Sequence, residues 1–165
     1  MTFEERCTEI VEETARLLTG ASAHAASAES LTGGLLASEI VRVAGSSRWF
    51  LEGCVTYTDE AKARRLSVDP ALLREHTAVS RPVAKAMAEG MLLTSGADIA
   101  VSTTGLAGPG PDEYGRPAGL VFIGGATKSG SVTRELELKG TRLEIRQSAV
   151  LEALLLLREL ARLVR

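Results

Sequence analysis

Residues 21–43 read ASAHAASAESLTGGLLASEIVRV and contain a run of small residues, a glycine-containing turn and a segment with helical spacing. Ala21–Ala28 fits a buried strand, and Thr32–Val43 has the apolar spacing of a helix that ends near Gly45. Strands that alternate with helices along a chain are typical of α/β proteins. The stretch therefore predicts an α/β fold with a strand-to-helix turn at Glu29–Gly34.

The rest of the chain alternates in the same way. Apolar spacing and capping signals predict a helix at Phe3–Leu18, a short helix capped by Asp59, a helix opened by Ser80 and stopped by Gly96, and a helix at Thr141–Val164. β-Rich runs predict strands at Gly53–Thr58, Ile99–Thr103, Leu120–Thr127 and Ser131–Leu138.

The last two strands are separated only by Lys128-Ser129-Gly130, which is a hairpin signal. Part of the sheet should therefore be antiparallel, while the strand–helix units favour parallel pairing. No repeat or linker divides the chain. We expect a single domain over residues 1–165, a three-layer sandwich whose mixed central sheet is flanked by helices.

Composition excludes several classes of protein. The 165 residues suit one domain, and a chain with 45% hydrophobic and 24% charged residues is typical of soluble globular proteins. No apolar run approaches the ~20 residues that a membrane span needs. A net charge of −2 gives no general attraction to nucleic acid or to anionic membranes. Neither kind of partner is expected.

The chain has few residues of the types that bind metals or form disulfides, namely two cysteines and two histidines. Cys7 and Cys54 are too isolated for a disulfide framework or a zinc site, and His24 and His76 share no metal spacing with them. We expect no metal and no cofactor. The N-terminus lacks the basic start of a signal peptide, so a cytoplasmic location is expected.

Leucines cover much of the last predicted helix rather than one stripe of it. Such a helix is either deeply packed or pairs with another subunit, and we expect a homodimer or a higher homo-oligomer. These leucines are residues 151, 154, 155, 156, 157, 160 and 163.

Ser30 is the first candidate catalytic residue. A serine in a strand-to-helix turn, followed by Gly33 and Gly34, lies beside the free N–H groups of a helix N-terminus, which stabilise anions. The pattern also fits a helix cap with a glycine-rich turn. Because neither histidine has a partner motif, a base for Ser30 would have to be a lysine. Lys62, behind a strand, is the candidate, although a solvated surface lysine is the alternative.

Other candidate ligand groups occur in three places. Thr104, Gly105 and Gly108 follow a strand in a long Gly- and Pro-containing loop that ends at Gly119, where backbone N–H groups could hold phosphate. Arg142 and Arg146 are one helical turn apart and could clamp a phosphate. The hydroxyls of Ser46 and Ser47, and the ring of Tyr57, are further candidates for contact with a ligand.

Six motifs together resemble the CinA C-terminal domain family and cover nearly the whole chain. They are Ala28-Glu29-Ser30-x-Thr32-Gly33-Gly34, Gly45-Ser46-Ser47-x-x-Phe50, Val55-Thr56-Tyr57-x-x-x-Ala61-Lys62, Ala78-Val79-Ser80, Thr104-Gly105-x-Ala107-Gly108-Pro109 and Arg142-x-x-x-Arg146. The family is similar to nicotinamide-nucleotide amidases, which hydrolyse nicotinamide mononucleotide to nicotinate mononucleotide and ammonia in pyridine-nucleotide salvage. The resemblance is to the stand-alone form, without the molybdopterin-binding-like N-terminal domain and any pyrophosphatase activity of that domain.

The resemblance implies a serine amidase that uses lysine instead of histidine and acts on a small nucleotide. Ser30 would be the nucleophile and Lys62 the base, with Ser47 relaying protons or serving as the alternative nucleophile. The remaining implied roles are substrate contacts. Thr104 and the amides of Gly33, Gly34 and Gly105 would bind the carboxamide oxygen or the phosphate, Arg142 and Arg146 would hold the phosphate, and Thr32, Ser46, Tyr57 and Gly108 would complete the pocket.

The chain departs from the family pattern at four places, one of which is Leu51-Glu52, where the family has a more Gly-rich pair. Thr77 stands where the family commonly has Gly, Arg81 where it commonly has an acidic residue, and the loop Gly110–Tyr114 has fewer glycines than usual. These differences could change the fit of the substrate. The competing function is a non-catalytic nucleotide-binding protein linked to competence or to the response to DNA damage.

Overall fold

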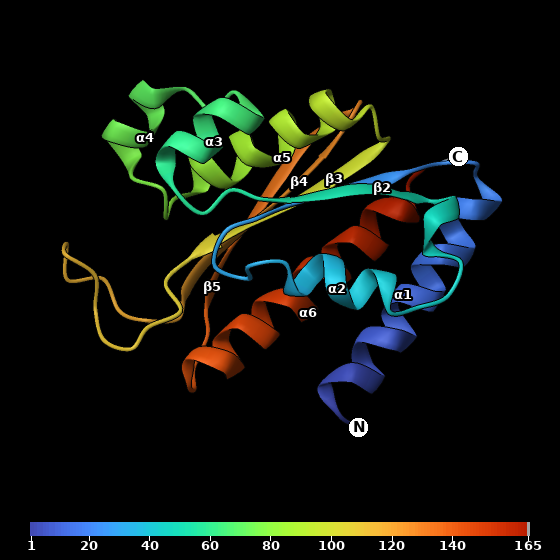
Figure 1. Ribbon diagram of the computed structural model, residues 1–165, viewed down its shortest axis with the longest axis horizontal. Coiled ribbons are helices and arrows are strands. Elements are labelled where there is room, and N and C mark those ends of the chain that lie inside the picture. The colour runs from blue at the N-terminus through green and yellow to red at the C-terminus, as the bar shows by residue number, and fades with distance from the viewer. Residues whose placement is uncertain (165) are drawn as a thin grey trace.

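The computed structural model describes residues 1–164 as a sheet between two layers of helices (Figure 1). One layer contains α1, α2 and α6, and the other contains α3, α4 and α5. The elements in chain order are α1 (Phe3–Gly20), β1 (Ala25–Glu29), α2 (Leu35–Val41), the 3-10 helix η1 (Ser46–Arg48), β2 (Phe50–Val55), α3 (Asp59–Leu66), α4 (Pro70–His76), α5 (Arg81–Ser95), β3 (Ile99–Gly105), β4 (Leu120–Thr127), β5 (Gly130–Glu137) and α6 (Arg142–Ala161).

The sheet is mixed, as expected. Its strand order is β2-β1-β3-β4-β5. β1 pairs in parallel with β2 and β3, whereas β4 is antiparallel to both β3 and β5. The carboxyl ends of the three parallel strands therefore meet at one edge, where ligands of open α/β sheets usually bind.

The strand-to-helix stretch folds with a shorter helix than predicted. All five residues of β1 are buried, but α2 begins at Leu35 rather than Thr32. Gly33 and Gly34 have positive φ values of 59° and 97°, which a right-handed helix does not allow. The turn at residues 30–34 is consequently an irregular segment between strand and helix.

The helix start predicted at Ser80 is confirmed, whereas the cap predicted at Asp59 is wrong. Thr2 forms a capping box with Glu5, and Ser80 caps α5. The cap of α3 is Thr58 rather than Asp59, because the Thr58 hydroxyl accepts a hydrogen bond from the Ala61 amide. Helix α4 was not predicted, although the sequence contains a residue that can cap it, Asp69. The carboxylate of Asp69 accepts a hydrogen bond from the amide of Ala71.

The leucines of α6 are packed inside the chain. Leu151, Leu154, Leu156 and Leu157 are all buried in the core that α6 shares with α1, α2 and one face of the sheet. A second core lies on the opposite face, under α3, α4 and α5. Deep packing is thus confirmed for this helix, and its leucine pattern does not require another subunit.

The helices of the described chain also bear on membrane insertion. None of them within residues 1–164 combines the length and the apolar character needed to cross a bilayer.

Thr77 has a strained backbone and offers a test of the fold. Its φ of 62° and ψ of 164° fall in a region that essentially only glycine adopts, and its buried hydroxyl has no partner within residues 1–164. We expect Thr77→Gly to raise the free energy of unfolding by about 1 kcal/mol, since relief of strain exceeds the added chain entropy. Thr77→Ala, which keeps the strain, should gain much less. Denaturant unfolding checks both, and equal gains would contradict the strain account.

Candidate active site

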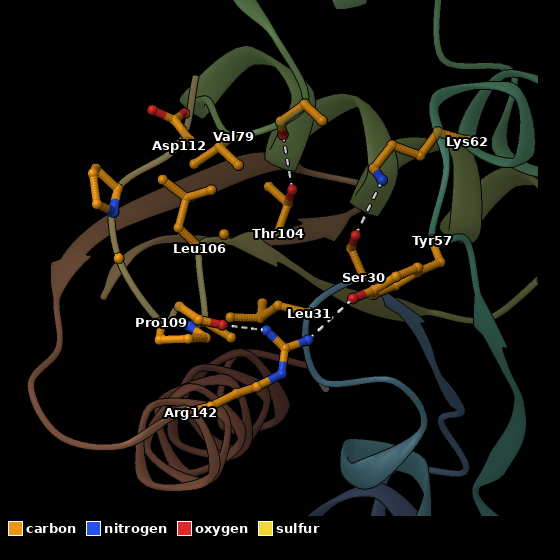
Figure 2. A pocket seen from close by; sticks show the side chains of 16 residues that line it. Ser30, Leu31, Tyr57, Lys62, Val79, Thr104, Leu106, Pro109, Asp112 and Arg142 are labelled. Atoms are coloured by element: carbon orange, nitrogen blue, oxygen red, sulfur yellow. Dashed lines mark hydrogen bonds between the residues drawn. The ribbon is translucent and has the colours of Figure 1, made fainter. Parts of the chain in front are cut away.

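A pocket of about 360 Å³ lies at the carboxyl ends of β1 and β3 (Figure 2). The turn after β1, helix α3, the segment before α5, the loop after β3 and the start of α6 form its walls. Its lining residues are Ser30, Leu31, Tyr57, Lys62, Ala78, Val79, Thr104–Asp112 and Arg142. Of the predicted site residues, the structure therefore brings Ser30, Tyr57, Lys62, Thr104, Gly105, Gly108 and Arg142 together.

Ser30 and Lys62 are in direct contact. The Nζ atom of Lys62 lies 3.1 Å from Oγ of Ser30 and 2.9 Å from the carbonyl oxygen of Thr56. The Ser30 amide donates to the carbonyl of Thr103, which extends the β1–β3 pairing and fixes the serine at the pocket edge. Lys62 is only 1% exposed, so the alternative of a solvated surface lysine is wrong.

The surroundings of Lys62 favour its neutral form. Burial lowers the pKa of the ammonium below its usual 10.5, and the more distant charge of Asp59 opposes this only in part. No carboxylate forms an ion pair with Lys62 within residues 1–164. A neutral amine here can donate one hydrogen to Thr56 and accept the Ser30 hydroxyl proton, as a general base requires.

Glu29 organises the turn that carries Ser30, and our sequence analysis assigned it no role. Its side chain is fully buried, and Oε1 accepts hydrogen bonds from the Thr32 hydroxyl and from the amides of Gly34 and Leu36. Oε2 accepts from the amide of Ala37. The available signal was an acidic residue just before a helix N-terminus, where a carboxylate satisfies unpaired N–H groups.

The amides of Gly33 and Gly34 are already bonded within the chain. Gly33 N–H donates to the carbonyl of Ser30 at 3.0 Å, and Gly34 N–H donates to Glu29 at 3.2 Å. The expectation that these amides bind substrate is therefore not supported. The two glycines instead allow the tight turn that the carboxylate of Glu29 caps.

Thr104 offers a hydrogen-bond acceptor at the pocket, and Gly105 offers a donor. The Thr104 hydroxyl donates to the carbonyl of Ala78 at 2.8 Å, so its oxygen remains available as an acceptor (Figure 2). Peptide groups of a strand alternate in direction, and Thr103 faces β1 through its bond from Ser30. The Gly105 N–H, two residues further on, consequently faces the same side and lies next to the Ser30 turn.

Arg142 forms the cationic end of the pocket. Its guanidinium donates to the carbonyl of Gly108 at 2.5 Å and to the hydroxyl of Tyr57 at 3.2 Å (Figure 2). Both partners are uncharged, so the positive charge of Arg142 is not neutralised by them. An exposed guanidinium at a pocket wall is suited to bind phosphate or carboxylate.

Arg146 and Thr32 stabilise the turn and do not line the pocket. The guanidinium of Arg146 donates to the carbonyls of Leu31 and Thr32, each at 2.9 Å. The buried Thr32 hydroxyl contacts Glu29 and the hydroxyl of Thr103. The expected pair of phosphate-binding arginines is thus divided, with Arg142 at the pocket and Arg146 holding the serine turn.

Ser46 and Ser47 lie at the opposite end of β2. They belong to η1, which precedes that strand, whereas the pocket is formed by residues that follow the parallel strands. A strand of six residues spans about 20 Å. Within one chain, this placement does not support proton relay or nucleophilic attack by Ser47, nor contact of Ser46 with a ligand in the pocket.

Neither cysteine is suited to act as a nucleophile. Burial raises the pKa of the Cys7 thiol to about 12, and burial also raises the pKa of Cys54. The reactive form of cysteine is the thiolate, which both environments disfavour. Ser30 is therefore the nucleophile candidate that the pocket presents with an adjacent base.

Two of the departures from the family pattern have defined contacts. Arg81 points to β5, where it donates to Thr133 and pairs with Glu135, and it is not among the pocket residues. Asp112, in the unusual loop, lines the pocket and pairs with Arg116, whose guanidinium also donates to the carbonyl of Val79. The loop is thereby tied to the segment before α5 and forms a defined wall.

Known proteins match this chain over nearly its whole length. The model of the CinA C-terminal domain family matches residues 7–161. A protein of Clostridium botulinum named for competence-damage induction is 44% identical over 151 residues, which cover 92% of this chain and 37% of the relative. A CinA-like protein of Chlorobaculum tepidum is 59% identical over 101 residues, or 61% of this chain and 24% of the relative.

The chain thus spans about a third of the length of several curated relatives that it matches. Solved structures of similar length also match. Competence damage-inducible protein A of Klebsiella pneumoniae has a TM-score of 0.90 and 35% identity, with 93% of this chain and 95% of that chain covered. Competence/damage inducible protein CihA of Agrobacterium tumefaciens has a TM-score of 0.87 and 36% identity, with 97% and 99% covered.

The buried Lys62 predicts a specific dependence of stability on pH. Its pKa in the folded state is below 10.5, so between the two values the unfolded chain binds more protons and stability rises with pH. The unfolding free energy of the wild type, minus that of Lys62→Met, should increase as pH rises toward 10.5, by at most about 1.4 kcal/mol per pH unit.

Denaturant unfolding at a series of pH values measures this difference. Lys85→Met, which removes an exposed lysine, is the matched control and should show no comparable rise. A flat or falling difference for Lys62→Met would show that the amine is not destabilised by burial.

Proposed function

The chain belongs to the CinA C-terminal domain family, and from this premise we propose that it is an amidohydrolase that converts nicotinamide mononucleotide to nicotinate mononucleotide and ammonia. The observation that carries the proposal is the contact between Ser30 and a buried lysine that forms no ion pair within residues 1–164. Such a pair has the two groups that serine-dependent hydrolysis of an amide needs, a nucleophile and an adjacent base.

In the proposed reaction, neutral Lys62 accepts the hydroxyl proton as Oγ of Ser30 attacks the carboxamide carbon. The same amine then returns the proton to the leaving nitrogen, so that ammonia departs and an ester remains on Ser30. Water attacks this ester with Lys62 again as the base, which releases nicotinate mononucleotide and restores the serine. Because burial disfavours the charged lysine, the pKa of the base lies closer to neutral pH, where general bases are most effective.

The carboxamide would be oriented by Gly105 and Thr104. In this proposal the Gly105 N–H would stabilise the oxygen that becomes negative in the tetrahedral intermediate. The Thr104 oxygen, whose hydrogen is used by Ala78, can accept from the carboxamide NH₂. These complementary contacts would favour an amide over a carboxylate, which lacks the NH₂ donor.

The phosphate would bind at Arg142. Its guanidinium lines the pocket, and its contacts to Tyr57 and to Gly108, in the loop that also contains Asp112, hold it in place. Substrate phosphate can displace these uncharged partners, because a hydrogen bond between two charged groups replaces one in which only the guanidinium is charged.

The reaction can be tested by ammonia release from nicotinamide mononucleotide with no metal added. We expect Ser30→Ala to lower kcat by about 10³-fold or more and Lys62→Met by about 10²- to 10⁴-fold. Ser129→Ala is the control, because Ser129 is exposed in the β4–β5 hairpin and does not line the pocket. Near-wild-type rates for Ser30→Ala would contradict the mechanism. Nucleotide binding without ammonia release at any pH would instead favour the accessory-protein function.

Arg142 should determine the preference for a phosphorylated substrate. Arg142→Met is expected to raise KM for nicotinamide mononucleotide by about tenfold or more, because a charge-assisted phosphate contact is lost. KM for nicotinamide riboside, which has no phosphate, should change little. Steady-state kinetics with both compounds measures this split. Equal losses for the two compounds would contradict phosphate binding by Arg142.

A further inference from the structure

The carboxylate of Asp112 closes a short turn in the loop that forms one wall of the pocket. Its Oδ1 atom accepts hydrogen bonds from the amides of Tyr114 and Arg116, at 3.1 and 2.8 Å. Its Oδ2 atom lies 2.8 Å from Nε and 2.7 Å from Nη2 of Arg116. A carboxylate has about four acceptor positions, and these contacts occupy them. Asp112 lines the pocket, but its carboxylate is already used to hold Arg116.

Arg116 connects this turn to the segment before α5. Its Nη1 atom donates to the carbonyl of Val79 at 2.7 Å. The carbonyl of the preceding residue, Ala78, accepts the hydroxyl of Thr104 at 2.8 Å (Figure 2). Within residues 1–164, no other hydrogen bond reaches the peptide groups of Ala78 and Val79. Arg116 and Thr104 therefore hold adjacent peptide groups of one short segment.

The strained backbone of Thr77 makes this segment dependent on the contacts that hold it. Thr77 directly precedes Ala78 and has a φ of 62°, a value that a non-glycine residue keeps only where its surroundings impose it. The bond from Arg116 to Val79 is one of the contacts that restrain the segment. Without this bond, Thr77 can relax and the carbonyl of Ala78 can move away from Thr104.

We propose that Arg116 is a positioning residue that makes the site selective for a carboxamide over the carboxylate of the product, a role that rests on the proposed function. While Ala78 accepts the Thr104 hydrogen, the Thr104 oxygen can only accept, which suits the NH₂ group of an amide. A Thr104 hydroxyl released from Ala78 can turn and donate to a carboxylate. Arg116 is not among the residues that line the pocket, so it acts through the segment and not by contact with the substrate.

Equilibrium binding in a protein without the nucleophile tests this role. In a Ser30→Ala background, isothermal titration calorimetry gives the dissociation constants of nicotinamide mononucleotide and nicotinate mononucleotide. Asp112→Asn/Arg116→Met removes both charges of the ion pair and leaves the net charge unchanged. We expect the preference for the amide, expressed as the ratio of the two constants, to fall by about tenfold, because the acid gains a hydrogen bond that the intact site denies it.

Three further variants serve as controls in the same background. Arg134→Met/Glu159→Gln removes an ion pair between β5 and α6 that does not line the pocket, and it should leave the ratio unchanged. Arg116→Lys keeps the charge and one donor group, and it should retain part of the preference. With Thr104→Val, removal of the Asp112–Arg116 pair should not change the ratio, since the hydroxyl through which Arg116 acts is absent. Thermal melts establish that each variant is folded.

The outcomes separate the role of Arg116 from the hydrolysis itself. An unchanged ratio in folded Asp112→Asn/Arg116→Met, or an equal fall with and without the Thr104 hydroxyl, would overturn the role of Arg116. If the ratio falls only when the Thr104 hydroxyl is present, the role is supported. A wild type that releases no ammonia although this fall is observed would count against the proposed hydrolysis and not against the positioning by Arg116.

Discussion

The carboxylate of Glu29 is the interaction on which the rest of the site depends. It is buried at the end of β1 and accepts four hydrogen bonds from the turn and from the start of α2. Hydrogen bonds to a charged group contribute about 1.5–3 kcal/mol each, and their loss would leave buried amides unpaired. Arg146 holds the other side of the same turn through the carbonyls of Leu31 and Thr32. Ser30 is thereby presented by a rigid segment rather than by a flexible loop.

The base that we propose for Ser30 is also held by contacts within the chain. Lys62 reaches Ser30 from α3, and its amine is confined between the serine oxygen and the carbonyl of Thr56. The same burial that fixes the side chain lowers its pKa, so position and basicity have one physical cause. The proposed mechanism does not need histidine, because a buried lysine with a lowered pKa can accept a proton and return it.

Much of the fold could be predicted because its signals are local. The hairpin after Lys128, the cap at Ser80 and the alternation of strands and helices all depend on neighbouring residues. The residue pattern made Ser30 and Lys62 candidates, but their proposed roles as nucleophile and base depended on the family motifs. The burial of Lys62 could not be predicted, nor could the separate positions of Arg142 at the pocket and Arg146 at the serine turn. These features depend on contacts between residues that are 32 to 115 positions apart in the chain. The position of Ser47 could not be predicted either. Its motif matches the family, but the residue precedes β2 and lies far from the pocket within the chain.

The most direct test of this account is to locate the acyl group during turnover. The protein would be mixed with nicotinamide mononucleotide, quenched in acid within the first turnover and digested, and the acylated side chain would be found by peptide mass mapping. We predict a nicotinate mononucleotide ester on Oγ of Ser30. An ester on Ser47 or Thr104, or release of ammonia in that first turnover with no acylated peptide, would contradict the central claim that Glu29 and Lys62 together make Ser30 the nucleophile.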